Sequence, residues 1–159
     1  MSIPWSRCTI RGTEIVLAAC AEETRTVLVS STSEIYGKNQ GPLHEDSDRI
    51  LGSPLKARWS YSTAKAVDEI LAYNYWRTMG TPSIVVRLFN CVGPRQTGEY
   101  GMVVPSLVRQ ALDDEDVTVY GDGTQQRSFY VADTSPACCR CWTSPGPSAT
   151  SSTSVLRRS

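Results

Sequence analysis

The sequence predicts an α/β fold in which helices flank a mainly parallel sheet. Two short apolar runs rich in β-branched residues, TVLVSS at 26–31 and SIVVRLFN at 83–90, lack the alternation of a half-exposed strand. Such runs are typical of strands that are buried on both faces, as in parallel sheets. A segment with helical spacing of apolar residues precedes each run, and this alternation of helix and strand is the pattern of an α/β domain.

The predicted elements follow in order along the chain. Residues 11–23 carry apolar side chains at near-helical spacing, so we predict a helix there, followed by the strand at 26–31. Residues 32–56 contain Gly and Pro punctuation with scattered acids, which predicts a long loop. Loops of this length within a compact domain are uncommon and are often functional.

The second half of the chain repeats the pattern. A helix is predicted from about Ser60 to Met79, because the GTP sequence that follows it stops a helix. The remaining predicted elements are the strand at 83–90, a loop at 93–101, a helix within 102–114 that begins at or just before Pro105, and a strand, VTVYG, at 117–121.

The overall composition excludes several classes of partner. Sixteen basic and sixteen acidic residues give a formal net charge of zero, so no long-range attraction to nucleic acid or to an anionic membrane is expected. No apolar run reaches the roughly 18 residues that a membrane span needs, and the first residues lack the apolar centre of a secretory signal. The expected compartment is therefore the cytoplasm.

The six cysteines include one C-x-x-C pair, Cys138 and Cys141, but no second pair accompanies it. The single histidine, His44, lies far away in the sequence. We therefore expect free thiols and no metal site.

The composition changes after Asp133. Residues 134–159 contain no acid and no lysine, and Ser, Thr and Pro fill more than half of the positions. No hydrophobic period is visible there. We therefore predict one domain at 1–133 and a disordered tail at 134–159.

Polar residues follow the predicted strands at the edge where parallel sheets bind ligands. Ser30 and Ser31 end the first strand, Thr32 follows it, and Asn90 ends the second. Tyr61 and Lys65 lie four positions apart on the intervening helix, so they share one face and can reach the same pocket.

This pairing has a chemical use. A nearby ammonium favours the ionised form of a phenol, which brings the phenol toward acid–base work. A threonine hydroxyl can hold the same substrate oxygen by a hydrogen bond. Taken alone, a Tyr-x-x-x-Lys spacing is more often a solvated surface pair. The order of the surrounding segments therefore decides between the two interpretations.

Four segments in order, VLVSSTSEIYG, YSTAK, VVRLFNCVGPRQ and VTVYGDGTQQRSFYV, resemble the extended short-chain dehydrogenase/reductase superfamily. Within it, the chain resembles the NAD-dependent epimerase/dehydratase family, which acts on nucleotide sugars. The resemblance covers about residues 10–133. It implies a partial Rossmann-like sheet, a nucleotide-sugar substrate and NAD as cofactor.

The resemblance also implies roles for the catalytic residues. Tyr61 would be the acid–base that exchanges a proton with a sugar hydroxyl as hydride moves to or from NAD. Lys65 would bind the nicotinamide ribose and favour the ionised tyrosine, and Thr32 would be the hydroxyl partner. Glu34 lies at a position that is acidic in decarboxylase-like and dehydratase-like members, although a solvated loop acid is an equally good interpretation.

Further positions would bind the ligands. Ser30 and Ser31 would join Lys65 and Tyr61 in contacting the cofactor. By the same resemblance, the substrate would be bound by Asn90 and Arg127 at its phosphates, by Val104 along the nucleotide and by Tyr120 at the base. Tyr120 is about as easily interpreted as a core residue.

The chain departs from the family pattern at both ends. No G-x-x-G-x-x-G turn, which would hold the NAD pyrophosphate at a helix N-terminus, occurs in it. By the resemblance, the first βαβ half of the sheet is missing, and the family sequence stops before the tail, so we expect a truncated member.

Several functions remain open at this point. A reaction like that of UDP-glucose 4-epimerase is the first expectation. A UDP-glucuronate decarboxylase-like or dehydratase-like reaction is the second, and an inert remnant without NAD binding is the third. A homodimer through the helix of Tyr61 is a further expectation from the family.

Overall fold

The computed structural model describes most of the chain. The described residues are 4–98, 102–124, 126, 129–131, 134–143 and 153–158. Their helices and strands alternate along the first two thirds of the chain, as the sequence predicted. The elements are α1 (Pro4–Glu22), β1 (Val27–Thr32), the 3-10 helix η1 (Ser33–Tyr36), α2 (Ala57–Met79), β2 (Ser83–Leu88), β3 (Cys91–Val92), α3 (Val103–Leu112), β4 (Tyr130–Val131), α4 (Thr134–Thr143) and β5 (Thr153–Arg158).

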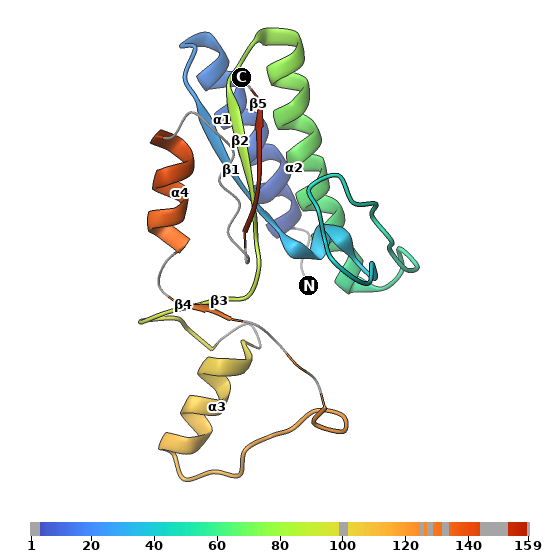
Figure 1. The fold of residues 1–159 in the computed structure, drawn as a ribbon, viewed down its shortest axis with the longest axis vertical. Helices are drawn as coiled ribbons and strands as arrows, with labels where there is room; N and C mark the ends of the chain where they lie inside the picture. Colours follow the sequence, from blue (N-terminus) through green and yellow to red (C-terminus); the bar gives the residue numbers. More distant parts are fainter. Residues whose placement is uncertain are drawn as a thin grey trace.

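The central sheet contains three of these strands, in the order β1-β2-β5 (Figure 1). β1 and β2 run parallel, with Val27 opposite Ser83 and Thr32 opposite Leu88, so their carboxyl ends meet at one edge of the sheet. β5 pairs with β2 in the antiparallel direction. The predicted α/β fold with a short parallel sheet and flanking helices is therefore confirmed, and β5 adds an antiparallel strand to it.

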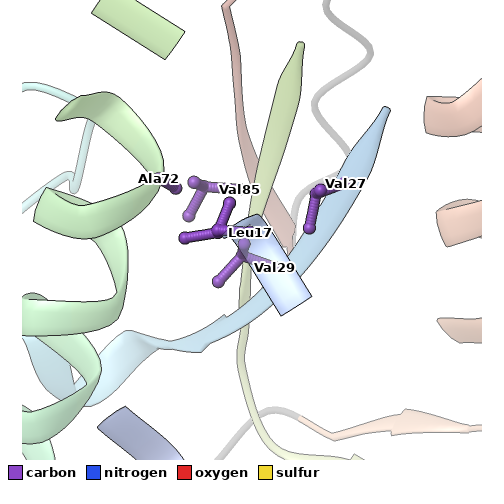
Figure 2. Packing of buried hydrophobic residues seen from close by; sticks show 5 residues of the cluster. All are labelled: Leu17, Val27, Val29, Ala72 and Val85. Atoms are coloured by element: carbon purple, nitrogen blue, oxygen red, sulfur yellow. The ribbon is translucent and has the colours of Figure 1, made fainter. Parts of the chain in front are cut away.

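The main core lies between the sheet and two helices. α1 and α2 pack against each other and cover one face of β1 and β2 (Figure 1). Figure 2 shows the side chains that fill this space, which come from both strands and both helices: Leu17, Val27, Val29, Ala72 and Val85. Burial of such side chains is the dominant favourable term in folding, so this cluster fixes α2 and its polar residues against the sheet.

The opposite face of β2 is also covered, which explains the apolar run Ile84–Val86 in its sequence. Ile84 and Val86 point away from the main core and pack with Leu28, Leu88 and Cys138 of α4. Adjacent residues of a strand point to opposite faces, so this run supplies apolar side chains to both layers.

Local signals set the ends of α2. The helix begins at Ala57, three residues before the predicted start, and ends at Met79 as predicted. Gly80 follows in the left-handed conformation, with φ 70°, and its N–H donates to the carbonyls of Trp76 and Tyr75. This is a common helix stop, because only glycine adopts that backbone conformation without steric cost.

The prediction of a strand at 117–121 is wrong. α3 begins at Val103, close to the predicted start, but residues 115–120 are exposed and form no strand within the described part of the chain. Instead, the Gln110 side chain contacts Thr118, accepting from its N–H at 3.1 Å and donating to its hydroxyl at 2.7 Å. A β-branched run forms a strand only where a partner strand is available to it.

The tail contains two elements in a region for which the sequence predicted disorder. The segment Thr134-Ser135-Pro136 opens α4, and hydroxyl residues followed by proline are favoured at a helix start. β5, with the sequence TSVLRR, pairs with β2 along its whole length. Among the described helices, none is long and apolar enough to cross a membrane.

Candidate functional site

A cleft of about 470 Å³ opens where β1 and β2 end. Several of the residues that the sequence predicted for catalysis and binding line it together: Ser30, Ser31, Thr32, Tyr61, Asn90 and Val104. The cleft collects side chains from segments that are distant in sequence, because the parallel register brings the ends of β1 and β2 side by side.

Thr32 lines this cleft and is held by the turn that follows it. The residue is 9% exposed, and its Oγ1 accepts a hydrogen bond from the backbone N–H of Glu34 at 3.3 Å. Accepting this bond caps η1, while the hydroxyl hydrogen can still donate to another oxygen. Ser62 of α2 is fully buried and donates to the Glu34 carbonyl at 2.7 Å, which ties the turn to the helix that carries Tyr61.

Tyr61 and Lys65 occupy successive turns of α2 but line different hollows. Tyr61 is 38% exposed and lines the 470 Å³ cleft. Lys65 lines a neighbouring groove of about 410 Å³ between α1 and β1, and Ser30 belongs to both hollows. The Lys65 Nζ donates to the Ser30 carbonyl at 2.9 Å, so the ammonium lies against the boundary between the two.

Asp68 is the counter-ion of Lys65. Its carboxylate is fully buried, and Oδ2 lies 3.3 Å from the Lys65 Nζ. Oδ1 has no hydrogen-bond partner of good geometry among the described residues. Desolvation raises the pKa of the Asp68 carboxyl above its usual value, against the lowering effects of the Lys65 charge and the Thr13 hydroxyl.

A second polar group lies one turn further along α2. Glu69 forms a two-pronged ion pair with Arg87 of β2, at 2.9 Å from Nε and 2.7 Å from Nη2, and its Oε1 also accepts from the Ser31 hydroxyl at 2.5 Å. Arg87 Nη1 donates to the Tyr36 hydroxyl at 3.0 Å and to the Glu45 carbonyl at 2.7 Å. The arginine thus joins β2 to α2 and to the loop after η1.

The electrostatics of this group favour the charged arginine. Burial opposes the guanidinium charge, but hydrogen bonds from Arg87 to Glu69 and Tyr36, together with the Glu69 charge, hold the Arg87 pKa above its usual value. The Ser31 hydroxyl is therefore part of a buried ionic network as well as part of the cleft wall.

The remaining predicted residues lie elsewhere. Glu34 is half-exposed and pairs with Arg58 at 3.3 Å; it does not line the cleft. Tyr120 is 81% exposed and lines a separate hollow of about 560 Å³ beside α3, which it shares with Val104. Arg127 lies outside the described residues.

The sequence interpretation missed the ionic residues that position the site. A signal for each was present. Arg87 is a charged residue inside an otherwise apolar buried strand, and such a residue requires a buried partner. Asp68 and Glu69 lie three and four positions after Lys65, on the same helix face, where acids can meet groups from β1 and β2.

Comparison with known proteins supports the family resemblance that the sequence motifs indicate. A family model described as "NAD dependent epimerase/dehydratase family" matches residues 5–149. The chain is 44% identical over 124 residues to a UDP-N-acetyl-alpha-D-glucosaminuronate decarboxylase of Bacillus cytotoxicus, covering 77% of this chain and 38% of that protein. It is 38% identical over 125 residues to UDP-glucuronic acid decarboxylase 1 of Xenopus tropicalis, covering 77% of this chain and 29% of that protein.

A solved structure gives the same result in three dimensions. The UDP-glucuronic acid 4-epimerase of Bacillus cereus, in complex with UDP-glucuronic acid and NAD, matches with a TM-score of 0.70 at 32% identity. The match covers 82% of this chain and 40% of that chain, so the present chain spans less than half the length of these relatives. The fold is Rossmann-like by this similarity. The chain therefore belongs to the NAD-dependent epimerase/dehydratase family.

Proposed function

We propose that the chain acts on a nucleotide sugar, oxidising a ring hydroxyl with NAD and returning the hydride to the opposite face, as a 4-epimerase does. The observation that carries this proposal is the shared cleft at the carboxyl ends of β1 and β2, which Tyr61, Thr32 and Asn90 line together. Family membership supports the substrate class.

The residues of the cleft supply acid–base chemistry. Tyr61 in its ionised form takes the proton of the sugar hydroxyl as the carbon loses its hydride, and it returns the proton when the ketone is reduced. Thr32 donates a hydrogen bond to the same sugar oxygen and so holds it for proton transfer. Lys65 brings a positive charge to the boundary of the cleft, where its Nζ donates to the Ser30 carbonyl.

The chain fits one end of the cofactor. Lys65 and the Ser30 backbone lie at the border of the two hollows, and this position suits the ribose next to the nicotinamide. When bound, NAD supplies the hydride acceptor. The sequence contains no G-x-x-G-x-x-G turn of the kind that holds the pyrophosphate, and the residues proposed for the cofactor lie on β1 and α2.

Decarboxylation of a UDP-uronic acid is the second candidate, and the 44% identical relative favours it. Oxidation at C4 of such a sugar gives a β-keto acid. The C5–C6 bond then breaks with release of CO₂, and a proton replaces the carboxylate at C5 before the ketone is reduced. The first step needs the same proton transfer to Tyr61, so the two candidates differ in the substrate carboxylate and in the steps after oxidation.

The experiment uses the purified full chain with added NAD. UDP-glucose and UDP-glucuronate are supplied separately, and the products are separated by chromatography while released CO₂ is measured. We expect one of them to be converted, with Tyr61→Phe lowering the rate at least about 100-fold. Tyr73→Phe is the matched control, because Tyr73 lies on the same helix with 40% exposure and lines neither hollow of the candidate site.

Each result separates the candidates. Conversion of UDP-glucose without CO₂ supports epimerisation, and CO₂ release from UDP-glucuronate supports decarboxylation. A folded chain that neither binds NAD nor changes either sugar at high protein concentration contradicts the proposal and favours an inert remnant.

A further inference from the structure

The structure holds a buried carboxylate that the proposed reaction does not use. Asp68 faces neither the substrate cleft nor solvent, and its side chain is 0% exposed. Its Oδ2 lies 3.3 Å from the Lys65 Nζ, and its Oδ1 lacks a well-aligned partner among the described residues. A buried, half-satisfied carboxylate is costly unless it has a specific task.

We propose that Asp68 is a positioning residue, which holds the Lys65 ammonium against the Ser30 carbonyl at the edge of the cleft. This inference rests on the proposed function, in which Lys65 lies at the border between its own groove and the cleft of Tyr61. Its geometric basis is the three-way contact among Lys65, Asp68 and Ser30, which joins α2 to β1.

The environment of Lys65 makes such a counter-ion necessary. The lysine side chain is only 20% exposed, so its ammonium needs polar partners inside the protein. The Asp68 carboxylate lies within ion-pair distance, and the Ser30 carbonyl accepts one of the three ammonium hydrogens.

The groups around Asp68 come from all of the elements packed against it. Lys65 and Glu69 neighbour it on α2, the Thr13 hydroxyl faces it from α1, and the Ser30 carbonyl reaches the same ammonium from β1. The Glu69 charge raises the pKa of Asp68 only as the smallest of the contributing effects, and Glu69 itself pairs with Arg87. Lys65 is therefore the natural partner of Asp68.

Burial of the Asp68 carboxylate also lowers the stability of the folded chain. Because burial raises the pKa of the Asp68 carboxyl despite the lysine charge, the ionised carboxylate destabilises the folded chain at neutral pH relative to a neutral group. A residue that costs stability where it lies is expected at a functional site. Holding the Lys65 ammonium in place is a role that accounts for this loss of stability.

The test measures the reactivity of individual lysines and needs neither NAD nor a sugar. Trace acetic anhydride acetylates only the neutral amine, with acetate leaving, and mass spectrometry of peptides gives the rate at each lysine across a range of pH. Lys38 and Lys56 are both exposed and serve as internal references. In the wild-type chain we expect Lys65 to react more slowly than both references at neutral pH.

The Asp68→Asn variant keeps the shape of the side chain and removes its charge. We expect its Lys65 to react at least about threefold faster relative to Lys38 and Lys56, because its amine loses the carboxylate that holds it. Asp113→Asn is the matched control, since it removes the same charge from an exposed position after α3 and should leave the ratio unchanged.

Three outcomes would overturn the proposal. One is a folded Asp68→Asn chain, checked by circular dichroism, whose Lys65 reactivity equals that of the wild type. Another is a wild-type Lys65 that reacts as fast as Lys56, which needs no variant at all. If the asparagine variant does not fold, Asp68→Ala is measured instead. The third outcome is a Lys65 acetylation rate in Asp68→Ala that equals the wild-type rate. Absence of sugar turnover would contradict the proposed function but would not contradict the positioning of Lys65 by Asp68.

Discussion

Arg87 of β2 and Glu69 of α2 meet as a two-pronged ion pair in the interior, with the guanidinium Nη2 2.7 Å from the carboxylate Oε2. The side chains are 8% and 13% exposed, and the pair joins the sheet to the helix that carries Tyr61 and Lys65. One turn earlier on the same helix, Lys65 bonds to Ser30, so α2 is tied to consecutive residues of β1, Ser30 and Ser31.

Glu69→Ala should strongly destabilise the chain, because it leaves the Arg87 charge buried without its partner. We expect the free energy of unfolding to fall by about 3–5 kcal/mol, measured by urea denaturation. Glu14→Ala is the control, since Glu14 pairs with Arg11 at the surface and the loss should stay below about 1 kcal/mol. Equal losses of unfolding free energy in the two variants would show that the buried ion pair stabilises the fold no more than the exposed pair does.

Ser62→Ala should loosen the turn beneath the cleft. The variant removes the hydroxyl that donates to the Glu34 carbonyl at 2.7 Å and leaves a carbonyl without this partner. We expect a loss of about 1–2 kcal/mol in unfolding free energy, with faster amide hydrogen exchange in η1. Thr63→Ala changes the adjacent, exposed position and should be near neutral; similar exchange in both variants would contradict a role for Ser62 in the turn.

The local sequence pattern was sufficient to predict β1 and β2, which pair with each other in the central sheet. The runs at 26–31 and 83–90 became β1 and β2, because each carries apolar residues toward both helical layers. The run at 117–121 has similar residues but formed no strand, because strand formation depends on a neighbouring strand that its own residues do not encode.

The candidate site could be predicted only where chemistry was visible in single residues. Thr32, Tyr61 and Asn90 follow strand ends or lie on the intervening helix, and the structure brings them into one cleft. The separation of Lys65 into the adjoining groove could not be predicted, because it depends on the direction of a long side chain and on its contacts with Asp68 and Ser30. Spacing on a helix gives a shared face, and tertiary contacts decide which hollow is reached.

Thr32→Val should separate the hydroxyl from the shape of the side chain. In the sugar-conversion assay we expect the rate to fall roughly 10- to 100-fold, because the substrate oxygen loses a donor while Val keeps the β-branched volume. Thr32→Ser retains the hydroxyl and should keep most of the rate. A serine variant as slow as the valine variant would contradict a hydrogen-bonding role and would indicate that the methyl group sets the geometry.

Asp68 gives the chain a pH dependence whose sign is set by its burial. Because the folded-state pKa of Asp68 lies above its ordinary value near 3.8, the folded chain binds this proton more tightly than the unfolded chain does. The resulting stabilisation is fully present at acid pH, below the ordinary value, and is lost as the pH rises through the folded-state pKa. The asparagine side chain in Asp68→Asn cannot titrate, so this variant does not lose stability in this way as the pH rises.

The unfolding free energy of Asp68→Asn should therefore exceed that of the wild type at neutral pH, and the difference should shrink as the pH falls toward 3.8. Urea denaturation of both chains at several pH values measures this difference. Asp113→Asn should show no comparable trend, because Asp113 is exposed. A wild-type chain that is more stable than Asp68→Asn at neutral pH would mean that the ion pair with Lys65 outweighs desolvation, and the carboxylate would then need no functional explanation for its presence.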